Sequence, residues 1–150
     1  LDIMTGDGPV GISTDDLFAG KTVAVFGLPG AFTRTCSAKH LPGFVDNADA
    51  LRAKGIDDIV CISVNDPFVM AAWGKDQSVG DRVRMVADGS GTFAAATGLE
   101  LDLVKGGLGM RCQRFSMIVD NGVVKDIETE DPPVAELTGA EKMLEKMASG

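Results

Sequence analysis

The sequence has few residues that could bind a metal or form disulfides. Its 150 residues contain three cysteines, one histidine and no C-x-x-C pair. A structural zinc site needs four closely spaced Cys or His ligands, and an odd number of widely separated cysteines cannot make the disulfide framework of a small secreted domain. We therefore expect no metal site, and each thiol has to be judged by its own surroundings.

The chain also lacks long hydrophobic runs and an excess of positive charge. No apolar stretch approaches the roughly 20 residues that cross a bilayer, and no charged leader with a following apolar segment opens the chain. The net charge is -8, from 14 Lys and Arg against 22 Asp and Glu, so nucleic acid and anionic membranes would both be repelled. These absences predict a cytoplasmic protein with no nucleic-acid partner and no membrane partner.

The composition is that of a folded domain. Apolar residues make up 45% of the chain, which suffices for one hydrophobic core at this length. The sequence has no internal repeat, low-complexity tract or block of like charge that would mark a boundary. We expect residues 1–150 to form a single domain.

Predicted strands and helices alternate along the chain. Short apolar or β-branched runs indicate buried strands, and these are Thr22–Phe26, Ile59–Val64 and Val83–Ala87. Apolar residues three and four positions apart, a proline at a helix start and flanking glycines indicate helices, and these are 37–53 with a kink at Pro42, Pro67–Asp76 and Thr92–Thr97. The segment from Gly98 to Met110 is predicted to be a loop or flap.

The end of the chain predicts a hairpin and a closing helix. Asn121-Gly122 favours a type I′ turn between two strands, and Thr138 to Glu141 has the pattern of a capping box before an amphipathic helix. Alternating strands and helices followed by a hairpin predict a thioredoxin-like α/β sandwich, in which helices flank a central mixed sheet. A flavodoxin-like doubly wound sheet is the competing fold, but it would not end in a hairpin.

Cys36 stands where the loop after the first predicted strand becomes a helix. Backbone N–H groups and the positive end of the helix dipole favour a thiolate at such a position. The alternative is a buried, inert cysteine, which position alone does not exclude. The residues around Cys36 are therefore needed to distinguish a reactive thiolate from an inert thiol.

The residues around Cys36 resemble a known active-site signature. From Pro29 to Phe44 the chain reads P-G-A-F-T-R-T-C-S-A-K-H-L-P-G-F. This resembles the peroxiredoxin signature, which has a threonine three residues before the reactive cysteine, and the type II or peroxiredoxin-5 class is the most similar. Later segments match that class in the same order, so the resemblance spans about residues 21–124. These segments are Ser63–Met70 with Trp73, Asp88–Gly91 and Arg114–Met117.

The resemblance implies a thiol peroxidase, an antioxidant oxidoreductase that needs no metal, haem or other cofactor. Cys36 would attack a hydroperoxide as a thiolate and become a sulfenic acid. Thr33 would hold the thiolate and the peroxide, Pro29 would shield the pocket from water, and Arg114 would supply positive charge. Strand alternation places Arg114 and Phe115 on opposite faces. The alternative roles are helix capping for Thr33 and a solvated surface charge for Arg114.

Two further residues could modulate the site. Arg34 stands where the family usually has a second proline, so it either adds a cation near the thiol or points into solvent. His40 follows Cys36 by one helical turn. It could touch the thiolate or serve in packing, and we do not expect it to be needed as a base.

The remaining cysteines are candidates for resolving the sulfenic acid or accepting glutathione. Cys61 matches the position of a second cysteine in plant type II members. It lies in a strand predicted to be buried, and a disulfide needs Cα atoms within about 7 Å, so pairing would require local unfolding. Cys112 is expected by strand parity to share a face with Arg114. There it could accept glutathione or trap Cys36; the alternative for both cysteines is a place in the core.

The resemblance also implies partners. The expected substrate is a hydroperoxide, and the expected reductant is glutathione with glutaredoxin, or thioredoxin. Members of this class usually pair as homodimers through loops beside the active site, which makes Trp73, Phe44 and the segment from Gly98 to Met110 candidates for that surface. Two other functions stay open. One is a redox sensor that relays oxidation from Cys36 to a partner protein, and the other is a chaperone or interaction domain without the chemistry.

Overall fold

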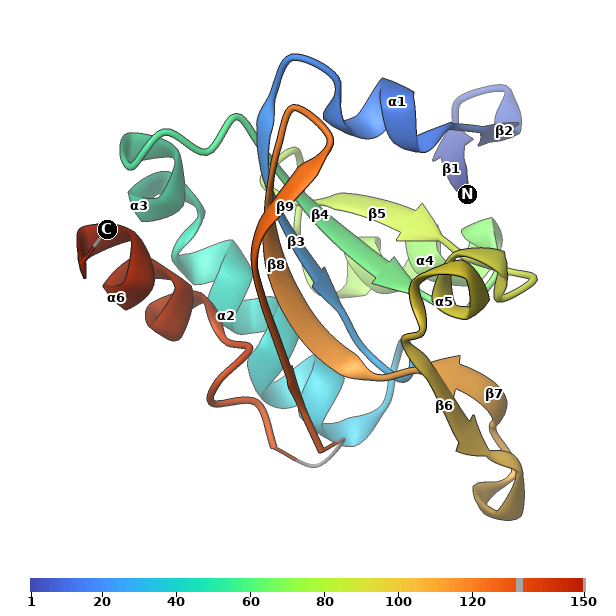
Figure 1. Cartoon of the computed structure of the whole chain (residues 1–150). Coiled ribbons are helices and arrows are strands. Elements are labelled where there is room, and N and C mark those ends of the chain that lie inside the picture. The colour runs from blue at the N-terminus through green and yellow to red at the C-terminus, as the bar shows by residue number, and fades with distance from the viewer. Residues whose placement is uncertain (132–133, 150) are drawn as a thin grey trace.

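A mixed sheet of seven strands forms the centre of the molecule (Figure 1). The computed structural model describes residues 1–131 and 134–149. The order of the strands in the sheet is β2-β1-β5-β4-β3-β8-β9, and β6 and β7 form a separate two-stranded sheet. The strands are β1 (Asp2–Thr5), β2 (Gly8–Gly11), β3 (Thr22–Gly27), β4 (Asp58–Ser63), β5 (Arg84–Ala87), β6 (Glu100–Leu103), β7 (Gly109–Cys112), β8 (Arg114–Asp120) and β9 (Val123–Glu130).

Helical segments connect these strands. They are α1 (Thr14–Phe18), the π-helical turn η1 (Cys36–His40), α2 (Leu41–Asp46), α3 (Ala48–Ala53), α4 (Pro67–Asp76), α5 (Thr92–Thr97), the 3-10 turn η2 (Val104–Gly106) and α6 (Ala140–Ser149). None of the helices in the described residues is long and apolar enough to pass through a bilayer.

The sheet divides the core into two layers, because successive side chains of a strand point to opposite faces. On β3, Ala24 and Phe26 belong to the cluster that packs against α2, α3, α4 and α6. Val23 and Val25 belong to the cluster on the other face, with α1 and α5. Strands β3 and β4 run parallel in the middle of the sheet, which explains their continuous apolar sequences. This architecture confirms the predicted thioredoxin-like sandwich with a mixed sheet.

Most predicted elements are present. Strands β3, β4 and β5 and helices α4 and α5 lie where the sequence predicts them, to within one residue at their ends. The hairpin of β8 and β9 turns at Asn121 and Gly122, whose φ angles of 48° and 82° are the left-handed pair that a type I′ turn requires.

Two expectations about local structure are wrong, and one region has elements that the sequence did not predict. The segment from Gly98 to Met110 is an ordered antiparallel hairpin of β6 and β7 that projects from the body of the molecule (Figure 1). Helix α6 begins at Ala140, so Thr138 does not cap it, and the Thr138 hydroxyl donates to Glu130 instead. The N-terminal β1, β2 and α1 were not predicted, although Ser13 and Asp16 form a capping box for α1.

The predicted helix 37–53 is three segments. Its first turn is π-helical, because the Leu41 N–H donates to the Cys36 carbonyl, five residues earlier. Pro42 has no N–H for the carbonyl four residues before it, so the expected distortion at Pro42 takes the form of a wider turn. A second break, which was not predicted, occurs at Asn47, whose backbone N–H and side-chain amide both donate to the Gly43 carbonyl at 3.1 and 2.8 Å.

The close contact between β3 and β8 makes a prediction about Gly27. A Cβ atom at Gly27 would lie 1.9 Å from Cε1 of Phe115, its antiparallel partner. We expect Gly27→Ala to lower the free energy of unfolding by about 1–3 kcal/mol, as overpacking of a core does. The control is Gly43→Ala in α2, where a Cβ would meet nothing within 4 Å; it should be neutral or stabilise by up to about 1 kcal/mol. Urea unfolding of both variants measures the difference, and equal stabilities would contradict the contact.

Candidate active site

Cys36 lies in the first helical turn after β3. Helical backbone begins at Arg34, and the Ser37 N–H donates to the Thr33 carbonyl at 3.0 Å. The Cys36 side chain is fully buried, among residues of the core layer that contains α2 and α4. Its place near the start of a helix agrees with the prediction, and its complete burial means that its neighbours determine its charge state.

Arg114 is the first residue of β8, and its guanidinium contacts Cys36. Nη2 donates to Sγ at 3.1 Å, and the arginine is 1% exposed. The antiparallel pairing of Gly27 with Phe115 places the start of β8 beside the end of β3. Phe115 points into the opposite core layer, so the predicted alternation is confirmed. The alternative of a solvated surface charge for Arg114 is wrong.

His40 holds the other side of the guanidinium. Arg114 Nη1 lies 2.7 Å from His40 Nδ1, and His40 Nε2 lies 3.0 Å from the Thr138 carbonyl. Because arginine has only donors, Nδ1 is the acceptor and Nε2 carries the proton, which makes the ring neutral. Burial and the adjacent Arg114 charge lower the pKa of His40 from 6.5 to about 3. His40 therefore contacts the arginine as a neutral group, and it does not act on the thiol as a cation.

The loop between β3 and Cys36 carries the other predicted residues. Pro29 is buried, Thr33 is half-buried and Arg34 is exposed. The Thr33 hydroxyl donates to the Gly30 carbonyl at 2.6 Å, so its proton is engaged within the loop. Arg34 is exposed to solvent, which is the second of the two alternatives that the sequence left open for it.

Sequence reasoning missed the residues that anchor this loop. Arg111 of β7 donates to the carbonyls of Pro29 and Val64 at 3.5 and 3.1 Å. Asn65 accepts the Ala31 N–H at 2.9 Å. Asn65 belongs to a segment that carried the family resemblance and could have been singled out. Arg111 comes directly after the segment from Gly98 to Met110, which was interpreted as a loop or flap, and no motif or pattern in the sequence marks it.

Comparisons with known proteins agree with this geometry. Residues 3–144 match the family model described as Redoxin. Peroxiredoxin-2C of Oryza sativa subsp. japonica is 48% identical over 136 residues, covering 91% of this chain and 84% of the relative. The crystal structure of reduced Prx3 in complex with H2O2 from Vibrio vulnificus is 47% identical with a TM-score of 0.93, covering 98% of this chain and 92% of that one. A putative thioredoxin reductase from Burkholderia cenocepacia is 52% identical with a TM-score of 0.90, covering 92% and 82%.

The chain belongs to the type II peroxiredoxins. Peroxiredoxins are thiol peroxidases, so the protein is an oxidoreductase that acts on peroxides. The sequence resemblance is thereby confirmed at the level of family, fold and enzyme class.

The other two cysteines of this peroxiredoxin are buried free thiols. Cys61 lies in the middle of β4, and burial raises its pKa well above the ordinary value. Cys112 ends β7, and its Sγ donates to the Leu28 carbonyl at 3.2 Å. Burial raises the pKa of Cys112 to about 12. Neither thiol is a nucleophile at neutral pH in this conformation.

Cys112 is not on the face that strand parity predicted. It packs in the core layer that contains Phe115, on the other side of the sheet from Cys36. The alternation fails because Cys112 and Arg114 belong to different strands, separated at Gln113, whose N–H donates to the Leu99 carbonyl at 2.7 Å. The expectation that Cys112 shares a face with Arg114 is wrong.

Two residues expected on an intersubunit surface are part of the core. Trp73 and Phe44 have no exposed surface. The Trp73 indole N–H donates to the Ser37 hydroxyl at 3.0 Å, and the Phe44 ring stacks on Phe26 with centroids 4.1 Å apart. Both residues support the helix that carries Cys36, and neither can contact a partner subunit in this conformation.

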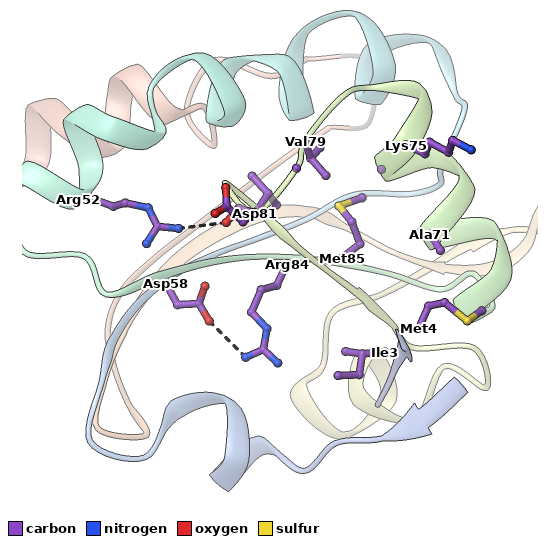
Figure 2. A pocket seen from close by; sticks show the side chains of 13 residues that line it. Ile3, Met4, Arg52, Asp58, Ala71, Lys75, Val79, Asp81, Arg84 and Met85 are labelled. Atoms are coloured by element: carbon purple, nitrogen blue, oxygen red, sulfur yellow. Dashed lines mark hydrogen bonds and ion pairs between the residues drawn. The ribbon is translucent and has the colours of Figure 1, made fainter. Parts of the chain in front are cut away.

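A surface groove of about 610 Å³ lies along β1, β5 and α4 (Figure 2). Two of its charged side chains have partners within the protein. Arg84 pairs with Asp58 at 3.3 Å, and Arg52 donates to the Asp81 carbonyl at 3.5 Å. Neither Cys36 nor Arg114 lines this groove.

The Cys36–Arg114 contact makes a kinetic prediction. Arg114→Met should lower kcat/KM for hydrogen peroxide by about 100-fold or more, the scale of losing one donor to a developing anion. Arg114→Lys keeps the charge but cannot reach both Cys36 and His40, so it should retain part of the rate. The control is Arg82→Met, because Arg82 is exposed, and its rate should stay within about twofold. Stopped-flow peroxide consumption measures all three variants, and a normal rate in Arg114→Met would contradict the assignment.

Proposed function

We propose that this protein reduces hydrogen peroxide and small alkyl hydroperoxides with Cys36 as the nucleophile. The single observation that carries this proposal is the hydrogen bond from the buried Arg114 guanidinium to Cys36 Sγ. A cation held against a sulfur favours the thiolate, which is the nucleophilic form. The proposal extends the family's thiol peroxidase activity to named residues and a substrate range.

In the proposed reaction the thiolate attacks the terminal oxygen of the hydroperoxide. An S–O bond forms and the O–O bond breaks, so the sulfur is oxidised and the peroxide is reduced. The terminal hydroxyl becomes part of a cysteine sulfenic acid. The departing alkoxide or hydroxide takes up a proton from water and leaves as an alcohol or water.

Arg114, Thr33 and Pro29 have distinct proposed roles in that step. Negative charge spreads from sulfur onto the leaving oxygen, and Arg114 offers fixed donors to it, each worth about 3 kcal/mol when well placed. The Thr33 hydroxyl can hold the peroxide once it exchanges its bond to the Gly30 carbonyl. Pro29 excludes water, which is consistent with its burial.

Peroxide has to reach a sulfur that has no exposed surface. Cys36 is 0% exposed, whereas Phe32 in the loop before it is 54% exposed and has a φ of 63°. A non-glycine residue in the left-handed region is strained. We propose that a small displacement of the loop 28–35 admits the peroxide.

Regeneration is proposed to use an external thiol. Cys61 and Cys112 are buried and protonated in this conformation, so an internal disulfide with Cys36 needs local unfolding. Glutathione with glutaredoxin, or thioredoxin, is the proposed reductant. Its thiol condenses with the sulfenic acid to give a mixed disulfide and water, and a second thiol then releases Cys36.

The proposed assembly is a homodimer in the cytoplasm. The β6–β7 hairpin exposes the apolar side chains of Val104, Leu108 and Met110, which supports it as the subunit contact. Relatives named without an organelle, such as peroxiredoxin-2C, support the location. Other relatives are chloroplastic or mitochondrial.

Intact mass after one equivalent of peroxide, without and with glutathione, tests the proposed cycle. We expect one added oxygen without glutathione and one added glutathione with it, in wild type and in a Cys61→Ser/Cys112→Ser variant. Loss of two hydrogens in wild type alone would identify an internal disulfide and overturn the external-thiol route.

Repeated turnover of peroxide distinguishes the proposed peroxidase function from the alternative, a redox sensor. With a recycling reductant the proposed enzyme consumes peroxide at a steady state, whereas a relay to a partner protein gives one stoichiometric burst and stops. A burst alone would contradict the proposed function, and so would the absence of any peroxide-dependent mass change at Cys36.

A further inference from the structure

A chain of hydrogen bonds continues from the active site to the other end of the chain. Beyond Arg114 and His40, the next group is the carbonyl of Thr138, which accepts from His40 Nε2 at 3.0 Å. Thr138 is fully buried and lies two residues before the first residue of α6. Its position is set by Glu130, the last residue of β9.

Glu130 organises the segment before α6 around one carboxylate. It accepts three successive backbone N–H groups, from Glu136 at 3.1 Å, Leu137 at 3.2 Å and Thr138 at 2.6 Å, and it also accepts the Thr138 hydroxyl. Burial raises the pKa of Glu130, but these hydrogen bonds outweigh it, so the pKa lies below its usual value. Glu130 is therefore ionised at neutral pH and fixes the backbone of residues 136–138.

Strand pairing ties the two ends of this chain together. Arg114 and Glu130 are register partners on the antiparallel strands β8 and β9. The guanidinium and the carboxylate therefore start from neighbouring backbone positions and are linked through His40 and Thr138 on the side of the sheet where Cys36 lies.

We propose that Glu130 is a positioning residue for Arg114, acting through the Thr138 carbonyl and His40. By fixing that carbonyl, Glu130 fixes the orientation of the His40 ring, and Nδ1 of the ring then holds one arm of the guanidinium while the other arm meets Cys36. This proposal rests on the proposed roles of Cys36 and Arg114, and it adds a remote residue that sets their geometry.

The neutral His40 ring separates the positive charge of Arg114 from the negative charge of Glu130, and this separation has a chemical consequence. A carboxylate in direct contact with a guanidinium forms a strong bidentate pair and would offset the positive charge that the sulfur needs. His40 orients the guanidinium without adding a negative charge beside it. In the chain of hydrogen bonds, two residues, His40 and Thr138, separate the carboxylate of Glu130 from Arg114, so the carboxylate fixes the backbone instead of neutralising the guanidinium.

The test is a double-mutant cycle between Glu130 and His40. Glu130→Gln replaces one acceptor oxygen by an amide donor, which cannot accept the clustered N–H groups. His40→Asn keeps an acceptor near the position of Nδ1 but has no group that reaches the Thr138 carbonyl. If Glu130 acts through His40, each single variant is impaired, and adding Glu130→Gln to His40→Asn has no further effect on the rate.

The readouts are the rate constant for hydrogen peroxide and the ultraviolet thiolate absorbance of reduced protein at neutral pH. The high pKa values of Cys61 and Cys112 leave Cys36 as the source of that absorbance. We expect Glu130→Gln to lower the rate constant about tenfold, the scale of a hydrogen bond to a charged group, with a matching loss of thiolate. A purely structural role would lower the unfolding temperature and leave thiolate per folded chain unchanged.

The matched control is Glu128→Gln. Glu128 lies two residues earlier on β9 and pairs with Lys146 at 2.9 Å, so this variant removes the same charge from the same strand. It should keep the wild-type rate. If Glu130→Gln does not fold, Glu130→Asp, which retains the charge on a shorter side chain, takes its place in the cycle.

Two outcomes would overturn the proposal. One is a rate in Glu130→Gln equal to that in Glu128→Gln, and the other is an effect of Glu130→Gln that is as large with His40→Asn as with His40. Either outcome, in a wild type that turns over peroxide, counts against the role of Glu130 alone. A wild type that does not turn over peroxide contradicts the proposed function instead, so the two failures are distinguishable.

Discussion

The contact between Arg114 and Cys36 is the interaction on which the site depends. The two residues are 78 positions apart in the chain, and both are buried. A buried guanidinium is costly unless it is paired and hydrogen-bonded. Here its arms meet a sulfur and a neutral imidazole. The antiparallel pairing of β3 with β8 and the helix after β3 bring these groups together, so the fold itself assembles the site.

The three thiols of this fold have different surroundings. All three are buried, and within the part of the chain that the structure describes only Cys36 accepts a hydrogen bond from a guanidinium. Cys61 is surrounded by the core, and the Cys112 thiol donates a hydrogen bond to the Leu28 carbonyl. Burial alone favours the protonated form of a thiol. The hydrogen bond from Arg114 is what sets Cys36 apart from the other two.

The sequence predicted those parts of the fold and site that local pattern or motif determines. Continuous apolar runs located β3 and β4, and Asn121-Gly122 located the hairpin of β8 and β9. The family motif located Cys36 and Arg114. Features that depend on distant contacts were missed. The glycines of the β6–β7 hairpin suggested a loop because the pairing of its strands is not visible locally.

The same limit applies to individual residues. Strand parity failed for Cys112 because a strand boundary at Gln113 is not marked in the sequence. Glu130 is one of many acidic residues in an acidic chain, and only the turn at 136–138 distinguishes it. Trp73 and Phe44 matched the family by position, but position carries no information about burial.

The most direct test of the central claim is the charge state of the Cys36 sulfur in the folded, reduced protein. Ultraviolet absorbance of the native protein at neutral pH, compared with the same protein unfolded in urea at that pH, counts the thiolates that folding creates. The account predicts one thiolate per native chain, lost on unfolding and lost again when Cys36 is replaced by serine. A native protein that shows no thiolate absorbance at neutral pH would contradict it.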